Sequence, residues 1–173
     1  MQYLTFHLAG EEYAIGILQV KEIIEYDALT KVPMTPPWIR GVLNLRGSVV
    51  PVIDLAVKFG QPESPVGKRT CIVIVGVDLG GERTVMGVVA DAVSQVMELP
   101  PEEITAPPAF GTKIRTDFLK GMGKAGKKFV LILDTDRVLS ADELQVVASL
   151  QETTEPNRRP GADVSTQNRE QGR

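Results

Sequence analysis

The sequence predicts a mainly β protein built from small antiparallel barrels. Most apolar residues occur in short runs, which either alternate with polar residues or are continuous, and turn residues separate the runs. The 173 residues include 16 glycines and 12 prolines, which favour many short elements over long helices. Only the segment that begins at Ser140 has the pattern of an amphipathic helix, and this balance of strand and helix is typical of small barrels.

The chain opens with a predicted strand in which Leu4, Phe6 and Leu8 share one face. A turn at residues 9–12 leads into a second strand. Residues 18–26 fit both a helical and an extended pattern, and we interpret them as a short turn followed by a strand. Further strands are expected at 70–77, 84–90, 93–99, 118–122 and 128–133.

A hairpin is predicted within residues 41–55, which read GVLNLRGSVVPVIDL, with its turn at Gly47-Ser48. The two-residue period of a strand places the side chains of Leu43 and Leu45 on one face. It places Val42, Asn44 and Arg46 on the other, which we expect to be displayed. Pro51 removes a backbone donor from the return strand, so that strand is expected at an edge or a seam of the sheet.

The last elements are a proline-rich loop, a helix and a polar tail. The loop is expected at residues 100–112, and it holds four prolines. Ser140 and Glu143 have the spacing of a capping box at the start of the helix. Residues 152–173 contain almost no apolar side chains and are expected to be disordered. The predicted organisation is therefore one domain at 1–151 followed by a tail at 152–173.

A weak internal repeat suggests that the domain contains two similar halves. Residues 15–23 resemble residues 86–94, and residues 50–55 resemble residues 130–135 in the same order. The matched positions include Asp54 and Asp134. Chance similarity between apolar strands is the alternative explanation.

Composition excludes several classes of function. The net charge of −3 gives none of the basic surface that nucleic-acid binding requires. The one cysteine, Cys71, allows no intramolecular disulfide and no cysteine-based metal site, and the one histidine, His7, has no local carboxylate partner for catalysis. No apolar run approaches the length that crosses a membrane, so we expect a cytoplasmic protein with no direct membrane insertion.

Residues 121–128, GMGKAGKK, satisfy two glycine-rich phosphate-binding patterns. Both patterns require the loop to open a helix, but a predicted strand follows here. We therefore favour a hairpin turn with solvated lysines. Asp134 and Asp136 lack the further ligands of a calcium loop, and we expect no catalytic residue, no metal site and no cofactor.

The hairpin face that carries Asn44 and Arg46 is the best candidate for recognition. An amide and a guanidinium held side by side on a strand form a fixed polar surface, and the planar guanidinium can donate two hydrogen bonds to one partner. The alternative is that Arg46 pairs within the protein with a glutamate such as Glu22. Both roles are compatible.

At this hairpin the sequence resembles the central signature of the CheW-type chemotaxis coupling proteins. The similarity extends over about residues 2–150 in conserved order. Further segments that resemble the family are 12–23, 33–37, 87–96 and 129–134. The central segment is the specific part of this match, whereas the later strands alone are not specific.

The resemblance implies two five-stranded SH3-like barrels that share a hydrophobic core, with a C-terminal helix. It also implies a non-catalytic scaffold that couples transmembrane chemoreceptors to a CheA-type histidine kinase in bacterial chemotaxis. Its partners are then the cytoplasmic tip of the chemoreceptor and the regulatory domain of the kinase, and the protein is recruited from the cytoplasm to membrane-associated receptor arrays. By motif match the residues expected to bind the receptor are Val20, Glu22, Gly41, Asn44 and Arg46. The residues expected to bind the kinase are Cys71, Gly87 and Val93.

Two other functions compete with this hypothesis. One is a nucleotide-binding protein that uses the loop Gly121–Lys128. The other is a general SH3-like module that binds peptides, although such grooves are rich in aromatic residues and this chain has one tryptophan and three tyrosines.

Overall fold

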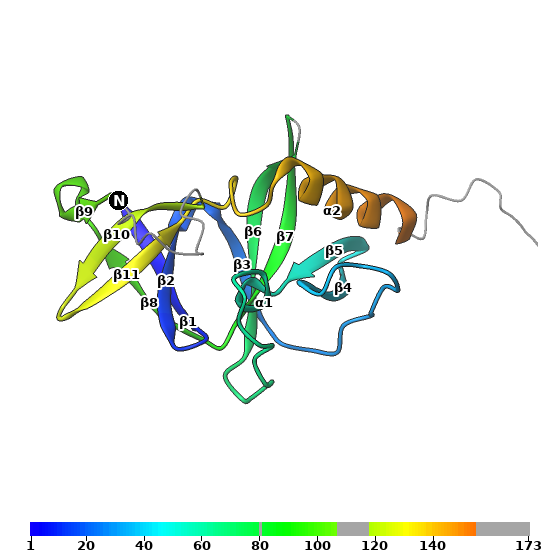
Figure 1. Ribbon diagram of the computed structural model, residues 1–173, viewed down its shortest axis with the longest axis horizontal. Helices are drawn as coiled ribbons and strands as arrows, with labels where there is room; N and C mark the ends of the chain where they lie inside the picture. The colour runs from blue at the N-terminus through cyan, green and yellow to red at the C-terminus, as the bar shows by residue number, and fades with distance from the viewer. Residues whose placement is uncertain (80, 107–117, 155–173) are drawn as a thin grey trace, which may run out of the picture.

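The computed structural model describes residues 1–79, 81–106 and 118–154, and in this part of the chain two β-sheets and a C-terminal helix form the fold (Figure 1). The strands are β1 (Gln2–Leu8), β2 (Glu11–Gly16), β3 (Val20–Glu25), β4 (Ile39–Leu45), β5 (Ser48–Ile53), β6 (Cys71–Leu79), β7 (Glu82–Ala90), β8 (Ala92–Glu98), β9 (Ile104–Thr105), β10 (Leu119–Ala125) and β11 (Lys128–Leu133). The helices are α1 (Leu55–Lys58) and α2 (Ala141–Thr154), with single 3-10 turns at Ile17–Gln19 and Pro101–Glu103. The predicted fold class, mainly β with a C-terminal helix, is confirmed.

The chain passes from the first sheet to the second and then returns to the first. The first sheet has the order β8-β1-β2-β11-β10-β9, and the second has the order β3-β6-β7-β5-β4. The second sheet is therefore built from one continuous stretch of sequence, and the first from both sides of it. The first sheet has six strands because β9, which lies in the segment predicted as a loop, pairs with Met122 and Gly123 of β10.

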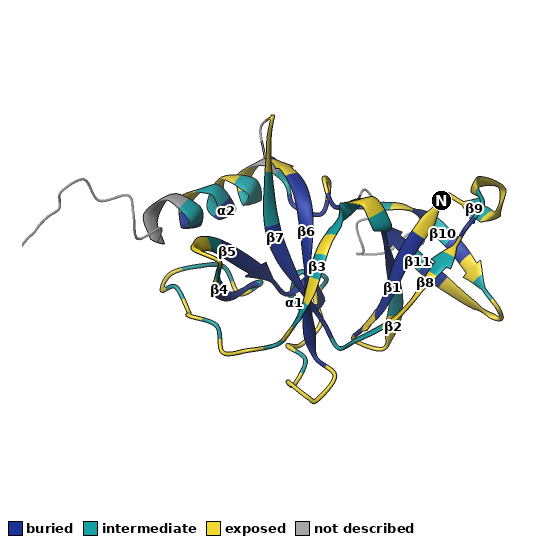
Figure 2. Cartoon of the chain, turned by 180° about the vertical axis from the view of Figure 1, so that it is seen from behind, coloured by how far each residue is buried: buried dark blue, intermediate teal, exposed yellow. Residues whose placement is uncertain are grey.

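Three apolar clusters stabilise the two sheets. The largest contains residues from both sheets, including Phe6 of β1 and Val73 of β6. A second lies within the first sheet and a third within the second sheet, where Ile72 and Ile74 pack. Alternate residues of β6 thus enter different clusters, which explains why the sequence of this strand is continuously apolar (Figure 2).

The hairpins β4–β5 and β10–β11 are structurally alike. Each has a register shift early in its first strand, next to Gly41 and Gly121 respectively. The backbone N–H of Asp54 donates to the carbonyl of Trp38 over 2.8 Å, as that of Asp134 does to Phe118 over 2.8 Å. In addition, β5 pairs in parallel with β7, and β11 pairs in parallel with β2. The internal repeat in the sequence thus has a counterpart in the structure.

Pro51 lies at a seam, as predicted. Its partner in β4 is Val42, whose own N–H and C=O bond to Thr30 on the outer side. The Pro51 nitrogen therefore faces away from β4, toward β7, and pairing with β7 begins only at Val52. The missing donor is thus placed where no ladder bond is required.

The helices are fixed by caps and an ion pair. The Asp54 side chain accepts a hydrogen bond from the N–H of Val57 and so caps α1. At α2 the predicted capping box forms, because the N–H of Glu143 donates to Ser140 Oγ and the N–H of Ser140 donates to the Glu143 carboxylate. Lys58 of α1 bonds Glu143 over 2.6 Å and joins the two helices.

The helix α2 reaches Thr154, and residues 155–173 of the predicted tail lie outside the described residues. None of the helices in the described part of the chain has the length and apolar character to span a membrane.

Candidate functional site

The turn of the β4–β5 hairpin consists of Arg46 and Gly47, one residue earlier than the sequence suggested. Both residues have positive φ, 52° and 89°, which is the backbone of the two-residue turn that matches strand twist. The Asn44 side chain stabilises this turn, because its Oδ1 accepts a hydrogen bond of 2.8 Å from the N–H of Gly47. Arg46 is therefore presented by a turn and not by a strand.

Arg46 pairs with Glu22 of β3. The side chain of Arg46 is 73 % exposed, and that of Glu22 is 31 % exposed. Hydrogen bonding to Glu22, together with the charge of that carboxylate, raises the pKa of Arg46. The internal partner considered from the sequence is thus present, yet the pair uses one guanidinium nitrogen and leaves further donors at the surface.

Of the hairpin residues expected to be exposed, Val42, Asn44 and Arg46, only two are exposed. Val42 is 8 % exposed, so the prediction that it is displayed was wrong. The reason is that Thr30 pairs with Val42 and covers the outer edge of β4. Asn44 is exposed, whereas Leu43 and Leu45 are half-buried and pack on the apolar cluster of the second sheet.

Two shallow hollows open between the edge strands of the second sheet. The Glu22–Arg46 hollow, about 290 Å³, has Lys21, Glu22, Arg46 and Ser48 on its rim and Leu45 and Ile74 in its wall. The Asn44 hollow, about 490 Å³, has Asp27, Thr30 and Asn44 on its rim and Ile24, Leu29 and Leu43 in its wall. Each hollow therefore combines an apolar wall with a polar rim, which suits a protein partner better than a charged small molecule.

The structure brings together three of the five residues expected at the receptor surface. Glu22, Asn44 and Arg46 border these hollows. Val20 is half-buried at the start of β3 and packs against the core between the sheets. Gly41 is buried, and a Cβ there would lie 2.7 Å from the carbonyl oxygen of Thr30, so its role is to allow the close approach of that segment.

The three residues expected at the kinase surface do not share one face: Cys71 and Gly87 lie on opposite faces of the second sheet, and Val93 lies on β8 of the first sheet. Cys71 belongs to the core between the sheets, and its thiol contacts the backbone of Val93. Burial raises the pKa of Cys71, and the hydrogen bond with Val93 offsets only part of this effect. Gly87 lies on the opposite face, where a Cβ would be 2.7 Å from Cγ2 of Ile72. Of the three, only Val93 is half-exposed.

Comparison with known proteins decides the family. A model of the CheW-like domain matches residues 2–143. The chain belongs to the CheW-like family. A chemotaxis protein CheW from Klebsiella aerogenes is 40 % identical over 146 residues, which cover 84 % of this chain and 86 % of that protein. Another from Treponema pallidum is 30 % identical, covering 86 % and 88 %.

A solved CheW-like structure is similar as well. The crystal structure of the scaffolding protein TtCheW from Thermoanaerobacter tengcongensis superposes with a TM-score of 0.72 at 33 % identity, covering 82 % of this chain and 95 % of that one. This chain accordingly has the CheW-like fold of two SH3-like subdomains, and it is a chemotaxis coupling scaffold. The recognition made from the sequence is confirmed.

The comparisons do not support the nucleotide-binding and peptide-binding alternatives for this CheW-like chain. In the structure, residues 121–125 belong to β10, and only Gly126 and Lys127 form a turn. A Cβ at Gly121 would lie 2.6 Å from the carbonyl oxygen of Thr105, and one at Gly123 would lie 2.7 Å from Leu99. These glycines permit close packing in a sheet, so the phosphate-loop pattern is coincidental.

In the described part of this CheW-like chain, no three carboxylate, histidine or cysteine side chains lie close enough together to bind a metal ion. Asp134, considered above as part of a metal pair, instead accepts a hydrogen bond from the N–H of Asp136. His7 is exposed on β1.

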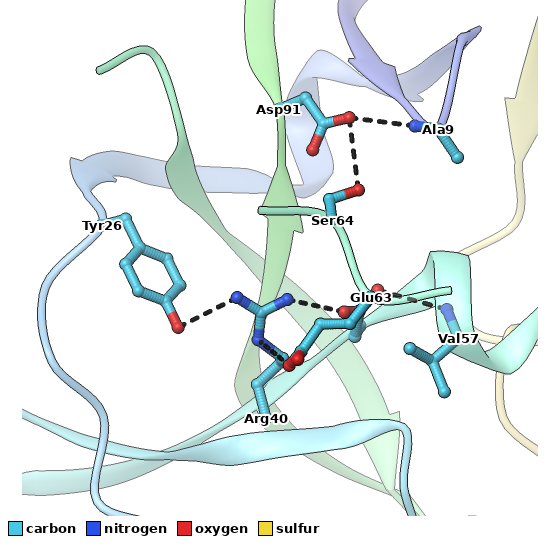
Figure 3. A network of polar contacts seen from close by, with 8 residues as sticks. Ala9, Tyr26, Arg40, Val57, Glu63, Ser64 and Asp91 are labelled. Carbon is cyan, nitrogen blue, oxygen red and sulfur yellow. Dashed lines mark hydrogen bonds and ion pairs between the residues drawn. The ribbon is translucent and has the colours of Figure 1, made fainter. Parts of the chain in front are cut away.

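The sequence analysis missed a buried charged cluster around Arg40 (Figure 3). The Arg40 side chain is 5 % exposed and bonds Asp54 over 2.7 Å, Glu63 over 2.9 Å and the Tyr26 hydroxyl over 3.2 Å. Burial alone would lower the pKa of Arg40, but the hydrogen bonds with Asp54 and Tyr26 more than offset it, so the pKa is raised. The available signal for this cluster was an arginine that directly follows the apolar Trp38 and Ile39 and directly precedes the predicted hairpin.

Proposed function

We propose that this chain couples the cytoplasmic tips of chemoreceptors to the regulatory domain of a CheA-type histidine kinase. It does so without catalysis of its own, from the cytoplasm and within membrane-associated receptor arrays. The observation that supports this best is the group of Glu22, Asn44 and Arg46 around the two hollows. This group lies at the hairpin whose sequence most resembles the family signature.

The proposed receptor surface has Glu22, Asn44 and Arg46 as its polar rim, with Val20 and Gly41 behind it. Receptor tips are helical hairpins, and half-buried Leu43 and Leu45 supply an apolar wall for such a helix. The free donors of Arg46 are placed to bond a carboxylate or carbonyl of the partner. Gly41 contributes by setting the path of β4 and not by direct contact.

Charge reversal tests the receptor surface. Arg46→Glu places two carboxylates side by side and removes the donor, so it should weaken binding to a soluble receptor-tip fragment at least tenfold by calorimetry, roughly the cost of one charged hydrogen bond. Because Arg46 is largely exposed, the melting temperature should change little. Lys124→Glu, an exposed charge change on the equivalent hairpin β10–β11, serves as the matched control.

The double variant Glu22→Arg with Arg46→Glu separates direct contact from internal pairing. It restores an ion pair between β3 and the β4–β5 turn but exchanges the charges that face the partner. If binding returns to the wild-type value, the pair acts only inside the protein and the proposed receptor contact is wrong. Continued weak binding with a wild-type melt supports it.

The proposed kinase surface is centred on Val93 of β8. Val93 pairs with Phe6 in the first sheet, and the Cys71 thiol lies against its backbone. Gly87 lies on the other face of the second sheet, so its proposed part is to allow the close packing of Ile72 there. Val93→Thr conserves shape while adding a hydroxyl, and it should weaken binding to the kinase regulatory domain without changing receptor binding. Gln95→Ala on the same strand is the control, and equal effects of the two variants would contradict the assignment.

A further inference from the structure

One segment on the surface contacts the second sheet and the link between the two sheets through its side chains. This segment, residues 60–67, follows α1, and we call it the strap. Its beginning is tied to α1, because the N–H groups of Gly60 and Gln61 donate to the carbonyls of Val57 and Ala56 over 3.0 and 2.7 Å. Its end is tied by Gly67, whose N–H donates to Thr70 Oγ1 over 2.8 Å.

The first side-chain contact anchors the strap to the second sheet. Glu63 bonds Arg40 over 2.9 Å, and Arg40 is held in turn by Asp54 and by the hydroxyl and ring of Tyr26. The guanidinium is buried and fixed from two sides, whereas the Glu63 side chain is 54 % exposed. Glu63 therefore binds a cation whose position is already set by the second sheet.

The second contact joins the strap to the first sheet. Ser64 Oγ donates to Oδ2 of Asp91 over 3.4 Å, and the same oxygen accepts a hydrogen bond of 3.0 Å from the N–H of Ala9 (Figure 3). Asp91 lies between β7 and β8, where the chain passes from the second sheet to the first, and its own N–H donates to the carbonyl of His7. Ala9 lies in the β1–β2 turn.

Arg40, Glu63, Ser64, Asp91 and Ala9 thus form one polar path from the second sheet to the first. The core between the sheets is apolar, and apolar contacts have little directional preference. Hydrogen bonds and ion pairs do have a preferred direction. The polar path therefore resists sliding of one packed sheet over the other. We propose that the strap, through Glu63 and Ser64, fixes the relative orientation of the two sheets.

The functional consequence rests on the proposed coupling role. Glu22, Asn44 and Arg46 lie at the second sheet, whereas Val93 belongs to the first. The orientation of the sheets therefore sets the geometry between the proposed receptor and kinase surfaces. Glu63 and Ser64 are positioning residues in this sense, since they lie outside both surfaces.

The double variant Glu63→Ala with Ser64→Ala tests the strap. It removes both bridging side chains and leaves Arg40 paired with Asp54 and Tyr26. Residual dipolar couplings of the backbone amides give the orientation of β1, β2 and β11 relative to β5, β6 and β7 in the free protein. The variant should show a changed or averaged orientation. Exchange at the Gly60 and Gln61 amides should rise by up to about tenfold, with cooperative unfolding retained.

The matched control is Lys68→Ala with Arg69→Ala, which truncates two exposed side chains just beyond the strap. It should leave the orientation and the amide exchange as in the wild type. An unchanged orientation and unchanged exchange in the Glu63/Ser64 variant would overturn the proposal. If that variant fails to fold, Ser64→Ala alone removes only a hydroxyl, and the same two readouts apply to it.

Assays with partners separate this inference from the proposed function. The Glu63/Ser64 variant should bind the receptor fragment and the kinase domain singly as the wild type does. It should couple them less well in an assembly that contains both, seen as lower receptor-dependent kinase activity. Wild-type protein that binds neither partner would refute the proposed function, while the orientation result would still decide the role of the strap.

Discussion

At the scale of single residues, backbone conformation decides what Arg46 can do. A position on a strand would place its side chain in line with Val42 and Asn44. The left-handed φ of Arg46 places it at the tip of the hairpin instead, where it reaches across to Glu22 and keeps most of its surface in water. Asn44 contributes in a way that strand alternation does not indicate, since its amide oxygen holds the turn that presents Arg46.

Part of the candidate site was predictable at this scale. Glu22, Asn44 and Arg46 were identified because they belong to a specific motif, and the Glu22 partner of Arg46 was considered because opposite charges were available. Arg40 was not predictable, because Glu63 and Asp54 reach it from a loop and a helix cap that no periodicity connects to β4. Val42 was misplaced for the same reason, since the segment at Thr30 that covers it is irregular.

The glycines of the β10–β11 hairpin lead to a prediction at this scale. Gly121→Ala should lower the free energy of unfolding by about 1–3 kcal/mol, because the new Cβ would meet a backbone oxygen at 2.6 Å. Gly126→Ala on the same hairpin meets no atom within 4 Å but has φ of +65°, so it should cost about 1 kcal/mol of backbone strain. Urea unfolding of both variants measures the difference, and a Gly121→Ala protein as stable as the wild type would contradict the packing role.

At the scale of elements, the longer strands were predicted well, as was the short turn before β3, whereas two other short elements were not. Strands such as β1 and β6 contain enough apolar residues to be recognised by pattern alone. The two-residue strand β9 and the one-turn helix α1 are shorter than any period that a pattern can show. The strand β9 exists because it pairs with the edge of β10, and α1 exists because of the local Asp54 cap together with the long-range Lys58–Glu143 pair.

The capping box of α2 gives a pH-dependent prediction. Burial alone would raise the pKa of Glu143, but the hydrogen bonds from Lys58 and Ser140 more than offset it and hold the pKa below its ordinary value of 4.5. A carboxyl with a lowered pKa stabilises the fold above its unfolded-state pKa, and this contribution is lost as the pH falls through the folded-state value. Thermal melts at a series of pH values below neutrality should show this loss in the wild type.

Glu143→Gln should remove that part of the pH dependence. It should also lower stability at neutral pH by about 1 kcal/mol, since the cap is weakened and the Lys58 pair is lost. Asp142→Asn changes an exposed acid in the same helical turn and is the control. Equal pH profiles for the Glu143 variant and the wild type would show that this pair contributes nothing.

At the scale of the whole molecule, the core between the sheets makes one cooperative unit of two similar halves. A row of aromatic rings crosses this core: Phe6 stacks on Tyr13 at 6.0 Å, Tyr13 lies 6.0 Å from Phe59, and Phe59 stacks on Phe118 at 4.4 Å. Phe59 follows α1, next to the second sheet, whereas Tyr13 lies on β2 and Phe118 directly precedes β10, both strands of the first sheet. The repeat was visible in the sequence. The pairing of strands was not, because parallel pairs such as β5 with β7 join segments that are distant in sequence.

Truncation of Phe59 tests this cooperativity. Phe59→Ala should lower the free energy of unfolding by about 2–3 kcal/mol, because Phe59 is only partly buried yet stacks on Phe118 and lies at a tilt against Tyr13. Fluorescence of Trp38 reports on the second half, and far-ultraviolet circular dichroism reports on both. The two transitions in urea should coincide in the variant and in the wild type. Phe129→Ala removes a ring that is 56 % exposed and is the control, and separated transitions in the wild type would contradict a single unit.

The order in which the strands enter the two sheets has a consequence for synthesis on the ribosome. Residues 20–90 hold every strand of the second sheet, so this sheet can assemble as soon as they emerge. The first sheet needs β1 and β2 from the beginning of the chain and β8 to β11 from residues made much later. The hairpin β1–β2, made first, therefore waits with both of its outer strand edges unpaired until β8 pairs with β1 and β11 pairs with β2. A nascent chain halted after β7 should bind chaperones through this hairpin, and one extended past β11 should release them.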